Sequence, residues 1–156
     1  MILFNDLPLP PSVNHCYAGF QGRRFRSKAL KSFLKSAEAW KLTHMGQVIE
    51  AERVMRIWMA EGYQFRVDCW FCFEHSRIYT LKGEVKPLDA HNYIKPLHDA
   101  LAEMLRIDDK HFFAGNAEKV TTNSKDEECS IVKLTPMSPT TKLSTLGSFR
   151  ATADGS

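Results

Sequence analysis

The chain has 156 residues, 44% apolar and 25% charged, with a net charge of +3, which predicts one soluble domain with a buried core. No apolar run approaches the roughly 18 residues of a membrane-spanning helix, so we expect no membrane contact. Asp6 and several prolines stand where a signal peptide requires basic and then apolar residues, so we expect a cytoplasmic protein.

The first elements predicted are an edge strand and a long helix. Residues 1–9 alternate loosely between apolar and polar side chains, and two prolines then close the strand. Residues 12–26 are predicted to form a loop. Ser27 can cap a helix that ends between Ile49 and Met59. The apolar stripe of this helix consists of Leu30, Phe33, Leu34, Ala37, Trp40, Val48 and Ile49.

Positive charge is concentrated at the start of this helix. Seven basic residues and one acid, Glu38, lie between Arg23 and Lys41. An ordinary solvated helix entrance would explain them. Their clustering with Tyr17, Phe20 and Phe25 instead indicates phosphate contacts plus an aromatic wedge against an unstacked base. The candidates for DNA contact are Arg23, Arg24, Arg26, Lys28, Lys31 and Lys35, with Asn14 and Lys119 as further candidates.

The clearest strand predicted covers residues 65–74, where apolar side chains alternate along the chain. Cys69 and Cys72 lie in this strand, three residues apart, and therefore face opposite sides, which is poor geometry for a shared metal. We interpret them as core cysteines in preference to a zinc or redox site. Residues 75–86 are predicted to form a basic loop, with a hairpin at Lys82-Gly83 as one form of it.

A second helix is predicted to begin at Asn92 or Tyr93 and to end near Leu105. Pro96 lacks the amide hydrogen that a helix interior needs, so it belongs in the first turn, with Asn92 as the cap. The segment before it is then extended, and Asp89 and His91 point the same way. The face predicted to be buried comprises Tyr93, Ile94, Leu97, Ala100, Leu101, Met104 and Leu105, while Lys95, Asp99 and Glu103 lie opposite.

The rest of the chain predicts two strands, residues 117–122 and 129–134, joined as a hairpin, and then a tail. The fold class is therefore α+β, a mixed β-sheet packed by two helices in the order β-α-β-α-β-β. We expect one domain over residues 1–136. Ser, Thr, Gly and Pro dominate residues 137–156, which are predicted to be disordered.

Acidic residues lie on both sides of the second helix. Asp89 precedes it, and the pair Asp108 and Asp109 follows it. Two carboxylates that are brought into contact repel each other by about 1 kcal/mol in water. A divalent cation would compensate, and a metal beside positive charge is suited to hydrolysing a phosphodiester. Helix capping and a polar turn are the alternative. Lys95 lies between these acids, where it would neutralise a scissile phosphate unless it is simply solvated. Asp99 is as consistent with a supporting partner or a salt-bridge acid as it is with a direct metal ligand.

The order and spacing of these residues resemble the RusA family of Holliday junction resolvases, found in bacteria and their prophages. The matches are Pro10-Pro11-Ser12-Val13-Asn14, Asp89-Ala90-His91-Asn92-Tyr93-Ile94-Lys95, Asp99-Ala100-Leu101, Asp108-Asp109 and Lys119. The resemblance implies a RusA-like fold and a homodimeric, Mg²⁺-dependent endonuclease that cuts symmetrically across four-way DNA junctions in recombination and repair. It implies metal ligands at Asp89 and Asp109, with Asp108 as an adjacent candidate, and an essential lysine at Lys95.

His91 departs from the family pattern, which has a second aspartate at this position. Imidazole is a poor ligand for Mg²⁺ and a better one for Mn²⁺. Three outcomes follow: His91 binds Mn²⁺, His91 contacts DNA or water while three aspartates hold the metal, or activity is reduced. We favour the second.

The sequence therefore predicts a metal-dependent endonuclease that hydrolyses branched DNA. One alternative is a branched-DNA-binding module without catalysis, in which His91 marks decay of the metal site. Another is a protein-interaction domain with incidental surface acids, which would lack the steep salt dependence of phosphate contacts.

Overall fold

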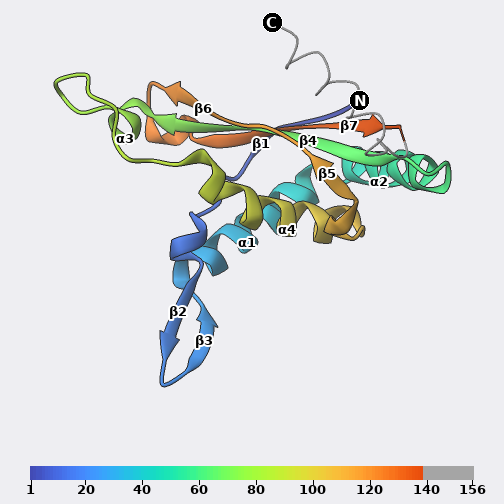
Figure 1. Cartoon of the computed structure of the whole chain (residues 1–156), viewed down its shortest axis with the longest axis horizontal. Coiled ribbons are helices and arrows are strands. Elements are labelled where there is room, and N and C mark those ends of the chain that lie inside the picture. Colours follow the sequence, from blue (N-terminus) through green and yellow to red (C-terminus); the bar gives the residue numbers. More distant parts are fainter. Residues whose placement is uncertain (139–156) are drawn as a thin grey trace, which may run out of the picture.

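The computed structural model describes residues 1–138 of the chain. Helices lie against one face of a mixed β-sheet, and a two-stranded arm projects away from it (Figure 1). The predicted α+β class and mixed sheet are confirmed. Residues 139–156, most of the segment predicted to be a disordered tail, lie outside the described residues. Within residues 1–138, no helix is long and apolar enough to cross a membrane.

The sheet is built around the strand that the sequence predicts most clearly. β4 (Gln64–Glu74) pairs on one edge with the antiparallel β7 (Cys129–Met137). Its other edge pairs with the parallel strands β5 (Phe112–Ala114) and β6 (Ala117–Thr122). β1 (Ile2–Leu7) pairs with the far side of β7 as an edge strand, as predicted.

The hairpin predicted for the last two strands is wrong. β6 and β7 lie on opposite edges of β4, and the 3₁₀ helix Lys125–Glu127 lies in the connection between them. A buried central strand needs backbone hydrogen-bond partners on both edges, and β6 and β7 supply one each. The turn residues that follow β6 are therefore part of a crossover.

The alternating pattern of β4 places its apolar side chains in the core, as predicted. Phe65, Val67, Cys69, Phe71 and Phe73 are all buried. Cys69 and Cys72 are buried free thiols, as expected of core cysteines. Burial raises the pKa of the Cys69 thiol to about 12, so this thiol is a poor nucleophile.

We expect Phe71→Ala to destabilise the fold by about 3–5 kcal/mol, because the change leaves a cavity where a fully buried ring had packed. Urea unfolding followed by tryptophan fluorescence measures the loss. Phe25→Ala is the matched control, since this ring is 52% exposed. A loss for Phe71→Ala as small as that for the control would contradict the core assignment.

The long helix predicted after Ser27 is two helices, α1 (Lys28–Thr43) and α2 (Met45–Ala60). The Ser27 hydroxyl caps α1, as predicted, by accepting a hydrogen bond from the amide of Leu30 at 3.1 Å. The break falls at His44. The Thr43 hydroxyl and the His44 ring both bond to the Trp40 carbonyl, and such side-chain bonds compete with helix continuation. Because α2 takes a new direction, Ile49 is 57% exposed rather than part of the apolar stripe.

The loop predicted over residues 12–26 is also wrong in part. The 3₁₀ helix Val13–His15 is followed by an antiparallel hairpin of β2 (Tyr17–Phe20) and β3 (Arg23–Arg26). Gln21 and Gly22 at its turn have φ angles of 49° and 76°. Positive φ at both turn residues matches the right-handed twist of a two-residue hairpin. We refer to β2, β3 and their turn as the arm.

The basic loop predicted after β4 contains a short helix, α3 (His75–Ile78), and a small antiparallel bridge between Tyr79 and Val85. Gly83 has a φ angle of 80° within it, consistent with a hairpin near Lys82-Gly83. The last helix is α4 (Ile94–Leu105). The prediction of two helices against the sheet therefore omitted α2 as a separate helix and α3.

Candidate nucleic-acid and metal site

The start of α4 is organised by Asp89. Its carboxylate accepts a hydrogen bond from the amide of His91 at 2.9 Å and caps the 3₁₀ helix Ala90–Tyr93, which leads directly into α4. The prediction that Asn92 caps the helix is therefore wrong, because the preceding 3₁₀ turn needs its own cap one turn earlier. Pro96 lies in the first turn of α4, as predicted.

Asp89 and His91 lie side by side on the surface. Asp89 Oδ1 and His91 Nδ1 are 3.3 Å apart, and both side chains are exposed. The hydrogen bond from the His91 amide holds the pKa of Asp89 below its ordinary value. Lys119 contributes in the same direction, and its ammonium donates to the Leu88 carbonyl at 3.0 Å. Lys119 on β6 therefore anchors the segment that carries Asp89.

Lys95 joins α4 to the loop that follows it. Its Nζ lies 2.6 Å from Asp99 Oδ1 and 2.7 Å from Asp109 Oδ2. Both carboxylates accept hydrogen bonds from the Lys95 ammonium and raise its pKa, and the bond to Asp109 has the larger effect. We call Lys95, Asp99 and Asp109 the lysine cluster. Asp99 is thus the salt-bridge acid that the sequence offered as one alternative to a direct metal ligand.

Asp108 faces a different neighbour. Its carboxylate accepts a hydrogen bond from the Lys110 amide at 3.0 Å and lies 3.2 Å from the Lys110 ammonium. The first of these contacts lowers the pKa of Asp108. Asp108 thereby caps the 3₁₀ helix Asp109–His111. Its contacts are therefore those of a helix cap, the alternative to a metal ligand that the sequence left open.

Within residues 1–138, no group of three or more His, Cys, Asp or Glu side chains lies close enough to hold a metal ion. The residue types nevertheless suit Mg²⁺, which prefers carboxylate oxygens. Asp89 uses Oδ1 for both contacts with His91, and Asp109 uses Oδ2 for Lys95. The second oxygen of each carboxylate has no hydrogen-bond partner among the described residues. Each of these two carboxylates therefore has one oxygen available to a cation, but residues 1–138 do not gather the two with a third ligand.

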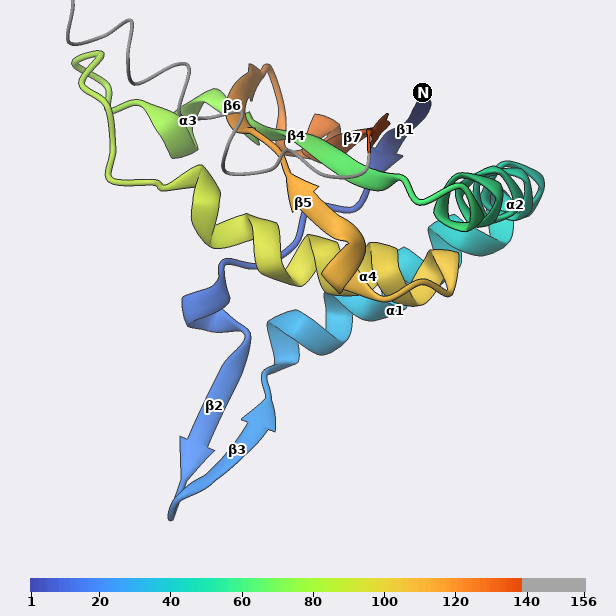
Figure 2. The same cartoon turned by 45° about the vertical axis from the view of Figure 1, so that its right-hand side comes forward.

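The arm projects away from the helices and the sheet (Figure 2), and its strand β3 is exposed throughout and carries Arg23, Arg24 and Arg26. The Arg24 guanidinium stacks over the Tyr17 ring at 4.7 Å, and the Phe25 ring is 52% exposed. Four further candidates for DNA contact flank the arm in sequence: Asn14 lies in the 3₁₀ helix before it, and Lys28, Lys31 and Lys35 lie in α1 after it. The last candidate, Lys119, lies on β6. Exposed guanidinium groups beside exposed rings suit phosphate contact together with base stacking.

One cavity connects the arm to the lysine cluster. It has a volume of about 270 Å³, and we call it the arm cavity. Its lining includes Arg24 and Arg26 from the arm and Lys95 and Asp99 from α4. Residues far apart in the sequence thus contribute positive charge and carboxylates to a single hollow.

Two features of this site escaped sequence reasoning. The arm was predicted as a loop because Gln21-Gly22 is not one of the common hairpin dipeptides, although Gly22 was a usable signal. Glu103 was predicted only to face away from the core, yet it lines the arm cavity beside Asp99.

No protein-family model matches this chain, and no curated protein is similar enough to it to match.

Proposed function

We propose that this protein is a metal-dependent endonuclease that hydrolyses branched DNA, with the four-way junction as its substrate. The observation that carries the proposal is the lysine cluster, of which Lys95 and Asp99 line the arm cavity. There Lys95 contacts Asp99 and Asp109 across two elements, while Arg24 and Arg26 line the same hollow. The ordered resemblance to the RusA family supports the same reaction.

The arm supplies the DNA contacts in this proposal. Arg23, Arg24 and Arg26 bind phosphates, and the exposed Phe25 ring packs against an unstacked base at the branch. An arm that projects from the body of the protein can enter the open centre of a junction (Figure 2). Phosphate contacts position the strand so that a scissile group reaches Lys95.

Lys95 acts at that scissile phosphate. Its ammonium is charged at neutral pH, as in any exposed lysine, and its hydrogen bonds to the carboxylates of Asp109 and Asp99 raise its pKa further. A fixed positive charge beside the phosphate stabilises the negative charge that develops on the phosphoryl oxygens. Asp99 keeps the ammonium in position from the next turn of α4.

The proposal assigns the metal to Asp89, Asp108 and Asp109, with Mg²⁺ as the ion and Mn²⁺ as the alternative. When bound, the ion supplies an activated water and stabilises the attacking and leaving oxygens. Asp89 and Asp109 each have a carboxylate oxygen without a protein partner in residues 1–138, whereas Asp108 must exchange its contact with Lys110.

We expect Asp89→Asn to weaken divalent-ion binding about tenfold or more, because one carboxylate ligand becomes a neutral amide. Electron paramagnetic resonance of Mn²⁺, without DNA, measures the affinity. Glu84→Gln, on the loop after α3, is the control. If three aspartates hold the ion, His91→Ala keeps the affinity. Equal Mn²⁺ affinity of the wild type and Asp89→Asn would remove Asp89 from the site.

The proposal includes a homodimer. A four-way junction has two equivalent strands to cut, and a two-fold symmetric pair of chains places one site at each. Sedimentation of the purified protein at several concentrations tests this directly.

Arm variants test the DNA-binding half of the proposal. The triple change of Arg23, Arg24 and Arg26 to Ala removes three exposed cations, so the slope of log affinity against log salt should fall by about 2–3. Junction binding measured by anisotropy over several salt concentrations gives this slope. Changing Lys125 to Ala, on the crossover between β6 and β7, should leave it unchanged. An unchanged slope for the arm variant would show that the arm does not contact DNA.

A second candidate function is branched-DNA binding without catalysis. The observation that favours it is the lack, within residues 1–138, of three gathered ligands, together with His91 in place of the expected aspartate. In this case Lys95 serves only to neutralise Asp99 and Asp109. The two candidates share the arm and differ only in strand cleavage.

A further inference from the structure

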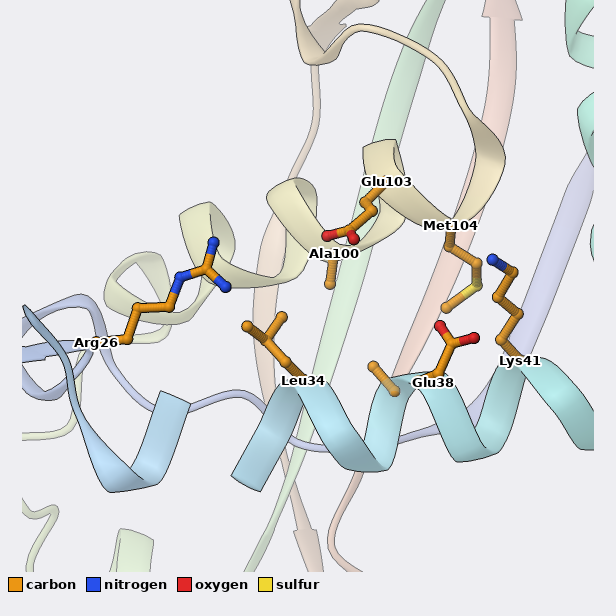
Figure 3. A pocket seen from close by; sticks show the side chains of 8 residues that line it. Arg26, Leu34, Glu38, Lys41, Ala100, Glu103 and Met104 are labelled. Carbon is orange, nitrogen blue, oxygen red and sulfur yellow. The ribbon is translucent and has the colours of Figure 1, made fainter. Parts of the chain in front are cut away.

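The cavity between α1 and α4 offers no selective binding site. It has a volume of about 260 Å³, and Figure 3 shows the cations Arg26 and Lys41 at its ends with the acids Glu38 and Glu103 between them. Its positive and negative charges balance, its lining contains no aromatic ring, and Met104 in its wall is part of the buried core. The reactive groups that the proposed function leaves unused are thiols, and they lie on the sheet.

Two cysteines face each other across neighbouring strands of this sheet. Cys72, near the end of β4, is paired in register with Cys129, the first residue of β7. Residues that are directly opposite on antiparallel strands have their side chains on the same face. Both thiols are free. This pair therefore differs from Cys69 and Cys72, which lie on one strand and face opposite sides.

The geometry of the pair suits a disulfide. Directly opposite residues of antiparallel strands have Cα atoms about 4.5–5.5 Å apart. Disulfides join residues with Cα separations of about 4.4–6.8 Å, so the strands need not move. The two thiols also share a hydrogen bond, which shows that the side chains of Cys72 and Cys129 point toward each other.

Burial makes both thiols slow to react at neutral pH. It is the main cause that raises the pKa of Cys129 to about 12, and the neighbouring Cys72 and Asp6 add to the effect. Burial also raises the pKa of Cys72. Because the thiolate is the nucleophile, the pair does not suit a rapid peroxide sensor. Cys129 is half-buried whereas Cys72 is 5% exposed, so a reagent meets Cys129 first.

We propose that Cys72 and Cys129 form an intramolecular disulfide by exchange with a small disulfide such as oxidised glutathione. The Cys129 thiolate attacks one sulfur of the oxidant, which forms a mixed disulfide and expels one glutathione thiolate. The Cys72 thiolate then attacks the Cys129 sulfur, closes the protein disulfide and expels the second glutathione. In balance, the two protein thiols lose two electrons and two protons, and the oxidant becomes two thiols.

The disulfide closes a long loop that carries the candidate site. The segment between the two cysteines contains Asp89, Lys95 and Asp109. A cross-link lowers the conformational entropy of the unfolded chain, and this effect grows with the length of the closed loop. Cellular reductants keep such thiols reduced in a cytoplasm, so we expect the disulfide to stabilise the fold under oxidising conditions. The inference does not rest on the proposed function, in which neither cysteine takes part.

The test incubates the full-length protein with excess oxidised glutathione at mildly alkaline pH, where more thiolate is present, and follows the intact mass. We expect a product lighter by two hydrogen atoms, in which proteolysis without reductant yields one peptide pair that joins Cys72 to Cys129. The melting temperature of this product should lie about 5 °C or more above that of the reduced protein. Dithiothreitol should reverse both changes.

Cysteine variants identify the residues that react. Cys72→Ser should abolish the lighter product and retain glutathione on Cys129, because the thiol that resolves the mixed disulfide is missing. Cys129→Ser should abolish both products. Cys16→Ser is the matched control, since Cys16 is also a buried free thiol and its loss should leave the lighter product unchanged. Melting temperatures of the reduced variants verify folding, and Cys129→Ala replaces any serine variant that fails to fold.

Three results would overturn the inference: a wild type that does not lose two hydrogens, a glutathione adduct on Cys129 that persists in the wild type, or a cross-link between other cysteines or between two chains. An unchanged or lower melting temperature of the oxidised protein would contradict the stabilising effect. None of these readouts uses DNA, so failure of the disulfide leaves the nuclease proposal intact, and failure of junction cleavage leaves the disulfide intact.

Discussion

Asp109→Asn is expected to reduce junction cleavage by about 10²–10³-fold or more while junction binding stays intact. The change removes the negative charge that is proposed to bind the metal and that contacts Lys95 at 2.7 Å. Binding is proposed to depend on the arm, which the change does not touch, and loss of negative charge near DNA should hold the affinity constant or raise it. Single-turnover cleavage of a labelled four-way junction measures the rate, and anisotropy measures the binding.

Asp126→Asn is the matched control for this change. Asp126 is an exposed aspartate in the 3₁₀ helix between β6 and β7, so its loss alters the charge of the protein equally without touching the lysine cluster. A cleavage rate for Asp109→Asn equal to that of this control would remove Asp109 from the active site.

Lys95→Met should lower the cleavage rate at saturating junction by about 10²–10³-fold with little change in junction affinity. The ammonium is proposed to stabilise charge that develops only in the transition state, and such a loss appears in kcat rather than in KM. Lys95→Arg keeps the positive charge and should retain part of the rate. A parallel loss of affinity and rate would instead make Lys95 an ordinary DNA contact.

A structural role of Lys95 can be separated from a catalytic one. Its side chain is 61% exposed, and exposed ion pairs contribute little to stability, so Lys95→Met should leave the melting temperature nearly unchanged. Lys110→Met is the control, because it also removes a lysine charge from an exposed ion pair, here the pair with Asp108. A large fall in melting temperature for Lys95→Met alone would assign the lysine cluster to folding.

Elements whose signal is local could be predicted from the sequence. The alternation in β4, the Ser27 cap of α1 and the place of Pro96 in α4 depend on side chains within one strand or one helical turn. In β4 every second side chain is buried, at Ser27 a hydroxyl accepts a hydrogen bond from a helix amide, and at Pro96 the amide hydrogen is missing. The structure confirms all three.

Features that depend on distant residues could not be predicted. β6 and β7 flank β4 because the central strand needs partners on both edges, and neither strand carries that information itself. The break at His44 depends on bonds to the Trp40 carbonyl that compete with the helix. Lys95 was expected to lie between acids, but its contacts with Asp99 and Asp109 follow from how the loop after α4 returns.

The central claim is that the residues around Lys95 hydrolyse DNA strands at a branch. It is tested most directly by incubating the purified protein with an end-labelled four-way junction in Mg²⁺ or Mn²⁺ and resolving the strands. We predict symmetric nicks in two opposing strands that require a divalent ion. Salt-sensitive junction binding with no nick under either ion would contradict the nuclease proposal and leave the binding module.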